Sequence, residues 1–157
     1  MAEYARVSYD QIVDEIKPLL IKHWEEIALY RDRVPLDVNY RIYKAHDDIN
    51  ALRIYTVRVD KVLIGYAIYV LRSHPHYQSN RWAVNDIYWI DPAHRNAGIG
   101  IGLFRFVENS LRSELKPDEI LIMHTNSKTM HPQAHRVLEF MGHDMVEVGH
   151  SKMLIGT

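Results

Sequence analysis

Three glycines at alternate positions follow the end of a predicted strand, and this run constrains the fold more than any other part of the chain. Ile90-Asp91-Pro92 ends the strand, and Gly98, Gly100 and Gly102 open an amphipathic helix. The N–H groups of a helix's first turn have no intrahelical partner and lie at the positive end of the helix dipole. Glycine lets the main chain approach a phosphate without an intervening Cβ. The run therefore predicts a diphosphate-binding loop; the alternative is a glycine-rich turn that only starts the helix.

The spacing of the glycines separates this loop from two common nucleotide-binding motifs. A Rossmann fingerprint requires G-x-G-x-x-G, whereas this run is G-x-G-x-G with Arg95 three residues before its first glycine. A P-loop requires Gly-Lys-Ser or Gly-Lys-Thr, and neither tripeptide occurs. The segment Arg95-Asn96-Ala97-Gly98-Ile99-Gly100, placed after Ile90-Asp91-Pro92, instead resembles the coenzyme A pyrophosphate loop of the GNAT superfamily of N-acetyltransferases.

Hydrophobic periodicity predicts a succession of helices and strands around the loop. A capping box at Ser8 and Gln11 begins a helix that Pro18 kinks or splits, and a second helical piece ends before Pro35. Asp60-Lys61 is predicted as a two-residue turn between strands. We expect a loop leading into a short strand within 34–43, strands over 52–59, 62–71, 82–90 and 119–124, a helix after Gly98, a helix from Pro132 to Gly142, and short strands over 144–148 and 151–155.

This order of elements is similar to that of the GNAT superfamily, so the resemblance covers most of the chain. It implies an α/β (α+β) fold with a mixed, mostly antiparallel central sheet flanked by helices, in a single domain over residues 1–157. The length of 157 residues, with 47% apolar and 25% charged residues, suits one globular domain with a core of its own.

Composition excludes several other kinds of chemistry. The chain has no cysteine, which rules out disulfides, thiolate metal sites and an acyl-cysteine relay. A net charge of −1 gives little reason to expect nucleic-acid binding. The N-terminus lacks the apolar core of a signal peptide, and the longest apolar run, 62–71, is too short to span a bilayer. We therefore expect a cytoplasmic protein with no membrane partner.

The resemblance implies an enzyme that uses acetyl-CoA as cosubstrate and transfers the acetyl group to an amine by direct attack in a ternary complex. It assigns the pyrophosphate to main-chain N–H groups of the glycine loop, with added charge and a hydrogen-bonding fork from Arg95; the alternative for Arg95 is a surface arginine. Main-chain groups of Tyr88, Trp89 and Ile90 are expected to align the pantetheine arm and polarise the thioester carbonyl. Asn126 is a further coenzyme candidate or else a turn asparagine. The implied coenzyme-binding residues are Trp89, Ile90, Arg95, Asn96, Ala97, Gly98, Ile99, Gly100 and Asn126.

Asp86 is the candidate general base. An amine like that of lysine has a pKa of about 10.4, so a group on the protein or a water chain must take its proton. Asp86 lies four residues before Ile90, where many family members carry a glutamate that serves as base. Strand alternation predicts that Asp86, Tyr88 and Ile90 share one face. The alternative is a strand aspartate paired with a basic neighbour.

Leu138 occupies the position at which the family often carries a tyrosine that protonates the departing thiolate. The segment from Ala134 to Gly142 otherwise fits the pattern A-x-x-x-Y-x-x-x-G. The thiolate then leaves unassisted, or His135 or Tyr88 serves as the acid, or the protein binds coenzyme A without efficient transfer. A non-catalytic acyl-CoA-binding or protein-interaction module on the same fold is therefore the alternative function. We favour transfer because a thiolate is a tolerable leaving group without an acid.

A polar cluster distinguishes the predicted loop over 72–80. In this family the corresponding connection is expected near the acceptor, which assigns Arg72, His74, His76 and Tyr77 to substrate binding. A His-x-His metal pair is the alternative, but no further ligand spacing accompanies it, so we expect no metal. The sequence does not identify the amine-bearing acceptor: a small molecule, a lysine or N-terminus of a protein and a modified nucleobase all stay open, and the first two are expected. Family members are often dimers, so a homodimer is compatible with the resemblance. Five tyrosines are predicted as packing or dimer residues: Tyr4, Tyr9, Tyr30, Tyr40 and Tyr43.

Overall fold

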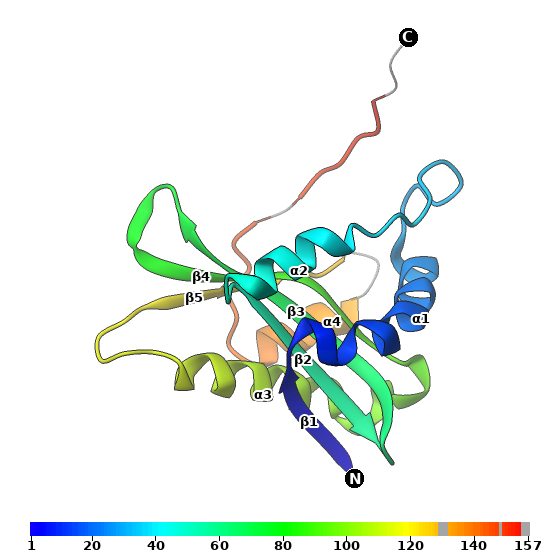
Figure 1. Ribbon diagram of the computed structural model, residues 1–157, viewed down its shortest axis with the longest axis horizontal. Coiled ribbons are helices and arrows are strands. Elements are labelled where there is room, and N and C mark those ends of the chain that lie inside the picture. Colours follow the sequence, from blue (N-terminus) through cyan, green and yellow to red (C-terminus); the bar gives the residue numbers. More distant parts are fainter. Residues whose placement is uncertain (129–131, 148, 155–157) are drawn as a thin grey trace. The chain divides into compact units, whose positions relative to one another are not determined.

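The computed structural model describes residues 1–128, 132–147 and 149–154. The chain divides after Asn126 into two compact units. The first unit holds one five-stranded sheet in the order β1-β2-β3-β4-β5 (Figure 1). Its elements are β1 (Ala2–Val7), α1 (Tyr9–Ile27), α2 (Tyr40–Asp48), β2 (Leu52–Val59), β3 (Val62–His74), β4 (Tyr77–Ile90), the 3₁₀ helix η1 (Pro92–Ala97), α3 (Ile99–Ser113) and β5 (Leu121–His124). The second unit holds α4 (Pro132–Phe140).

The sheet is mixed and mostly antiparallel, as predicted. Strands β1 to β4 pair antiparallel with their neighbours, and β5 pairs parallel with β4. Asp60 and Lys61 both have left-handed backbone conformations, with φ of 49° and 67°, between the paired residues Val59 and Val62. Two positive φ values are what a tight two-residue hairpin requires, so the predicted turn is confirmed.

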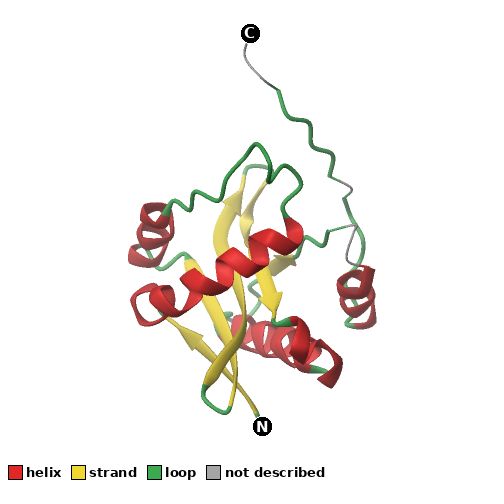
Figure 2. Cartoon of the chain, turned by 90° about the vertical axis from the view of Figure 1, so that its right-hand side faces the viewer, coloured by secondary structure: helices red, strands yellow, loops and turns green. Residues whose placement is uncertain are grey.

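Helices cover both faces of this sheet (Figure 2). On one face Leu103 and Val107 of α3 pack in a cluster with Tyr55 and Tyr69. On the other face Ile12 and Ile16 of α1 pack in a cluster with Ile54, Tyr66 and Trp89. The capping box is confirmed, since the Ser8 N–H donates to Gln11 Oε1 at 2.8 Å. The sheet is therefore held between α3 and α1, and β4 contributes to both clusters.

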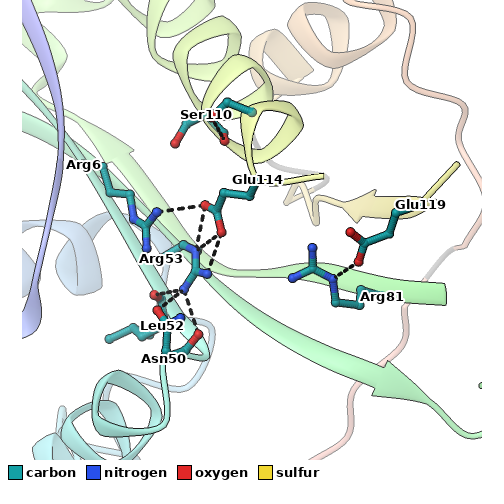
Figure 3. A network of polar contacts seen from close by, with 9 residues as sticks. Arg6, Asn50, Leu52, Arg53, Arg81, Ser110, Glu114 and Glu119 are labelled. Atoms are coloured by element: carbon teal, nitrogen blue, oxygen red, sulfur yellow. Dashed lines mark hydrogen bonds and ion pairs between the residues drawn. The ribbon is translucent and has the colours of Figure 1, made fainter. Parts of the chain in front are cut away.

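An ion-pair cluster joins the neighbouring strands β1 and β2 to the end of α3 (Figure 3). Arg53 of β2 is only 3% exposed and donates from Nε and Nη2 to both oxygens of Glu114, at distances of 2.6–3.1 Å. Arg6 of β1 donates to the same carboxylate at 2.9 Å. The remaining Arg53 nitrogen donates to the carbonyls of Asn50 and Leu52. Every nitrogen of a buried guanidinium thus has a partner, as low-dielectric burial requires.

The N-terminal half contains three elements that the sequence did not predict correctly. Residues 2–7 form the edge strand β1, although no strand was predicted there. Residues 40–48 form α2 instead of contributing to a strand: β1 already occupies the free edge of β2, so a strand at 34–43 has no place in the sheet. The two predicted helical pieces are one helix, α1, with Pro18 inside it. Proline removes one helical hydrogen bond, and burial of Ile12, Ile16 and His23 on either side keeps the helix continuous.

Two further predictions, at the β3–β4 connection and at the C-terminus, are also wrong. The predicted loop over 72–80 is mostly strand, because β3 and β4 continue to pair through Arg72↔Trp82 and Ser73↔Arg81. The predicted strands over 144–148 and 151–155 are absent from residues 144–147 and 149–154, while residues 148 and 155 lie outside the described part. An isolated apolar alternation cannot satisfy its main-chain groups without a partner strand.

Candidate active site

Strand β4 runs well past the end of its partner β5. The two strands pair only from Arg81↔Leu121 to Val84↔His124, whereas β4 continues to Ile90. On its other edge β4 remains paired with β3 as far as Ile90. Because every second residue of an antiparallel strand directs its N–H and C=O away from that partner, residues 85–90 present main-chain donors and acceptors at an edge that no strand of the described residues covers. This edge suits an extended ligand.

A β-bulge in β4 places Asp86. Ile68 pairs with Ile87 and Tyr69 pairs with Asn85, so Asp86 is the extra residue between them. Its exposed carboxylate accepts a hydrogen bond of 2.5 Å from the hydroxyl of Tyr43, on α2. Tyr88 instead packs edge-on against Phe104 of α3, with ring centroids 5.1 Å apart. Asp86 and Tyr88 therefore contact helices on opposite faces, because the bulge interrupts the alternation. The predicted shared face is wrong for Asp86 but holds for Tyr88 and Ile90, which both pack against the cluster on the α3 face.

Tyr43 packs against the cluster on the α1 face, as predicted, and its bond to Asp86 makes it a candidate site residue that the sequence analysis did not propose. Burial, followed by the hydrogen bond to Asp86 and the charge of Asp86, raises the pKa of Tyr43 above its ordinary value of 10.0. The hydroxyl therefore remains a donor at neutral pH. No signal in the sequence pointed to this contact, because it depends on α2, which was not predicted as a helix.

The two candidate acids lie in different units. Burial raises the pKa of Tyr88 to about 12, so its hydroxyl stays protonated at neutral pH. His135 lies on α4, where its Nε2 is 3.4 Å from Glu139 Oε1. Leu138 on the same helix is only 5% exposed.

The glycine loop leaves the first N–H groups of α3 without helical partners. Gly98, with φ of 70°, ends η1 and begins α3 in the left-handed conformation that favours glycine. The first helical bond is donated by Gly102 to the Gly98 carbonyl at 3.0 Å. The N–H groups of Ile99, Gly100 and Ile101 precede that bond, which is the arrangement that binds phosphate at helix N-termini. Asn96 and Ala97 form the end of η1.

The third glycine serves packing instead of ligand approach. A Cβ added to Gly102 would overlap the ring and hydroxyl of Tyr4, from β1. At Gly100 the nearest atom to an added Cβ is Ile90 Cδ1, at 3.6 Å, and at Gly98 there is none within 4 Å. Only the first two glycines therefore leave open space beside the loop, as a ligand requires.

Arg95 makes contacts that differ from those expected. Its terminal nitrogens donate to both oxygens of Glu26 on α1, each at 2.6 Å, and its Nε donates to the Ile90 carbonyl at 2.9 Å. The indole N–H of Trp89 donates to the same carboxylate at 2.9 Å. Glu26, Trp89 and Arg95 line one side of an open pocket of about 740 Å³ beside Pro92. The expected fork toward a phosphate is thus directed at a carboxylate.

The residues predicted to bind substrate lie at the other end of β4. Arg72 and His74 end β3 and Tyr77 begins β4, with His76 in the turn between them. The His74 ring stacks on Trp82 at 4.6 Å and lies 5.0 Å from the Tyr77 ring. At about 3.3 Å per residue, Tyr77 lies roughly 40 Å along the strand from Ile90. The cluster is thus remote from the glycine loop, while Arg72 and His74, beside Trp82, lie roughly 13 Å along β4 from Asp86.

The remaining predictions concern the end of β5, metals and membranes. Asn126 is exposed two residues after β5, and its neighbour Thr125 shares a hydrogen bond of 2.9 Å with the Tyr69 hydroxyl. The described residues contain no group of three or more His, Asp or Glu side chains placed to hold a metal ion. Across the same residues, no helix is both long and apolar enough to span a membrane.

Known structures share this fold at low sequence identity. A ribosomal-protein-alanine N-acetyltransferase from Brucella melitensis biovar Abortus 2308 has a TM-score of 0.69 and 17% identity, covering 99% of this chain and 100% of its own. An aminoglycoside acetyltransferase from an uncultured soil metagenomic sample, in complex with sisomicin, has a TM-score of 0.73 and 10% identity, covering 99% and 97%. A predicted acetyltransferase with acetyl-CoA from Clostridium acetobutylicum has a TM-score of 0.71 and 16% identity, covering 98% and 96%.

The sequence itself matches a family profile over most of its length. No curated protein matches the chain significantly. The profile of the acetyltransferase (GNAT) family, however, matches residues 13–142, a span that runs from α1 to the end of α4 and includes the glycine loop. Together with the mixed sheet, the loop after β4 and the helices on both faces, this match shows that the chain belongs to the GNAT family of acetyltransferases.

Proposed function

We propose that this protein is an acetyl-CoA-dependent N-acetyltransferase that acetylates an amine by direct attack in a ternary complex. The observation that carries the proposal is the end of β4: an uncovered main-chain edge over residues 85–90 leads directly into a loop with free helical N–H groups. An extended arm attached to a diphosphate fits this arrangement, and coenzyme A has that form, because its pyrophosphate joins the pantetheine arm to the nucleotide.

Main-chain groups would hold the coenzyme. The N–H groups of Ile99, Gly100 and Ile101 face the pyrophosphate, where the helix dipole also favours negative charge. The uncovered edge of β4, which includes Trp89 and Ile90, would pair with the pantetheine arm. Its outward N–H groups suit the oxyanion of the tetrahedral intermediate because they are already oriented, and one such donor is worth about 3 kcal/mol of barrier. Asn126 stays a candidate for a further contact beyond β5.

Asp86 would accept the proton of the attacking amine. The nitrogen forms a bond to the thioester carbonyl carbon, its proton passes to the carboxylate directly or through water, and the C–S bond then breaks to release the thiolate. Tyr43 supports Asp86 by fixing one carboxylate oxygen, which leaves the other for the proton. Tyr88, held protonated by burial, or His135 would protonate the thiolate, or the thiolate leaves unassisted.

The acceptor would be an amine on a small molecule or a protein. The names of two structurally similar proteins span this range, an aminoglycoside acetyltransferase and a ribosomal-protein-alanine N-acetyltransferase. Arg72 pairs with Trp82 and His74 stacks on it, roughly 13 Å along β4 from Asp86, so Arg72, His74, His76 and Tyr77 stay candidates for contacts to an acceptor long enough to span that distance. A homodimer stays a prediction.

A non-catalytic acyl-CoA-binding module is the second candidate, and Leu138 favours it. This residue stands where family members often carry the acidic tyrosine, and it is buried on α4. A module of this kind would bind the coenzyme through the same loop without releasing its thiol.

Thermal unfolding and thiol release distinguish the two candidates. Acetyl-CoA at 100 times its Kd should stabilise the folded protein by about 2.7 kcal/mol, with ADP and NAD as controls. Free thiol should then appear with at least one amine from a panel of an aminoglycoside, an alanine-terminated peptide and a lysine peptide. Stabilisation without thiol release from a broad panel supports the binding module, and no stabilisation of the folded protein refutes both candidates.

A further inference from the structure

The last turn of α1 carries an acidic residue where helix electrostatics disfavour it. Glu26 lies one residue before the end of the helix, and that turn contains no basic residue to offset the negative end of the dipole. Its side chain is also only 23% exposed. A carboxylate in this position requires compensation from outside the helix.

The junction of β4 with the glycine loop supplies such compensation. Glu26 accepts two hydrogen bonds from Arg95 and one from the Trp89 indole, all between 2.6 and 2.9 Å. Arg95 is anchored in turn on the Ile90 carbonyl, at the last residue of β4. The carboxylate thus joins a helix, the end of a strand and the first loop residue of the proposed coenzyme site.

A second set of directed contacts, made by His23, joins α1 to the sheet beside this junction. His23, one turn earlier on α1, shares a hydrogen bond of 2.8 Å with the buried Tyr66 hydroxyl of β3. Its ring lies against that of Trp89, with centroids 6.3 Å apart. Nonpolar side chains would pack α1 here equally well, whereas bidentate ion pairs and directed hydrogen bonds fix one arrangement. The polar end of α1 therefore specifies where the loop begins.

We propose that Glu26 is a positioning residue for the coenzyme loop, holding Arg95 and Trp89 so that the N–H groups at the start of α3 are preorganised for the diphosphate. In this arrangement Arg95 braces the loop, and its guanidinium is not the principal phosphate ligand. The proposal rests on the proposed function for the identity of the ligand, but the bracing of the loop does not depend on it.

The test compares Glu26→Gln with the matched control Glu25→Gln. Glu25 lies in the same turn, and its exposed side chain has no hydrogen-bond partner in the described part of the chain. In ligand-free protein, Glu26→Gln should speed amide hydrogen exchange across residues 93–102. It should also raise the Kd for coenzyme A about tenfold, equivalent to about 1.4 kcal/mol. The KM for acetyl-CoA should rise in parallel, with kcat at saturation within about twofold. Glu25→Gln should match the wild type in each measurement.

A second variant keeps the test informative if Glu26→Gln does not fold. Trp89→Phe removes one donor to Glu26 and retains the aromatic packing, so it should produce the same changes at about half the size on a logarithmic scale. If the folded Glu26→Gln variant shows unchanged amide hydrogen exchange across residues 93–102, the proposal is overturned. Tighter coenzyme binding also overturns it, because Glu26 would then be withholding Arg95 from the phosphate. If the wild type does not bind coenzyme A, the proposed function is refuted instead. The amide hydrogen exchange measurement still tests whether Glu26 positions the loop.

Discussion

At the scale of single residues, the pair formed by Asp86 and Tyr43 makes the sharpest claim about chemistry. Asp86→Asn keeps an oxygen that can accept the Tyr43 hydrogen bond but removes the proton acceptor. We expect kcat to fall by about 10²- to 10⁴-fold, the usual contribution of a general base, with little change in coenzyme affinity. Tyr43→Phe leaves the Asp86 carboxylate in place, so we expect a smaller decrease in kcat, of about tenfold or less. Steady-state kinetics with the best amine of the panel measure both.

The control for this pair is Asp37→Asn, which makes the same change at an exposed position before α2. Full activity in Asp86→Asn would contradict the assignment and leave deprotonation to water alone. The position of Asp86 on β4 was predictable from the strand pattern. Its bulge and its partner were not, because both depend on how β3 and α2 meet that strand.

At the scale of elements, the glycine run divides into two functions that substitution separates. Gly102→Ala forces a Cβ into the ring end of Tyr4 of β1, so the Tyr4 side chain or the packing of α3 on β1 must shift; we expect a loss of about 1–3 kcal/mol in unfolding free energy. Gly100→Ala meets only ordinary contacts and should leave stability within about 1 kcal/mol of the wild type. Its added methyl lies beside the N–H groups proposed to bind the diphosphate. It should therefore weaken coenzyme binding at least tenfold.

Urea denaturation and coenzyme titration of the two variants form a matched test. A Gly102→Ala protein as stable as the wild type would show that the Tyr4 side chain moves aside without cost, which would contradict a packing role for Gly102. The strand end, the connection and the helix around the glycines were predicted correctly because all three depend on local signals. The sequence could not assign Gly102 to packing, since its partner lies on β1, about a hundred residues away, in a strand that was not predicted.

At the scale of the whole molecule, the sequence specified the antiparallel core but not its edges. The strand patterns of β2, β3 and β4 and the apolar face of α3 are strongly periodic, and the sheet follows them. Short or weakly apolar segments have no strong periodicity of their own, so their secondary structure depends on the elements already packed around them. β1 pairs with the free edge of β2, and α2 packs beside it as a helix. The ion pairs of Glu26 and Glu114 could not be predicted from the sequence either, because their arginine partners are distant along the chain.

The ion-pair cluster of Glu114 gives a global prediction, because it links β1, β2 and the end of α3. Burial alone would raise the pKa of Glu114, but the Arg53 hydrogen bonds and the charges of Arg53, Arg6 and Arg81 outweigh it. The pKa therefore lies below the ordinary value of 4.5. A lowered pKa in the folded state gives a stabilisation that is complete above about pH 5 and is lost as the pH falls through the folded pKa.

Glu114→Gln tests this linkage. At pH 7 the variant leaves the buried Arg53 guanidinium without a counter-charge, and we expect its unfolding free energy to fall by about 2 kcal/mol. At pH 3 the wild type has lost much of the same interaction by protonation, so the difference between the two proteins should shrink. Urea denaturation across this pH range measures it, with Glu119→Gln as the control, since that carboxylate is equally exposed but its arginine partner, Arg81, is 38% exposed where Arg53 is 3% exposed; its loss at pH 7 should therefore be smaller. A constant difference at every pH would mean that Glu114 stabilises the fold through shape alone, because only its charge is lost on acidification.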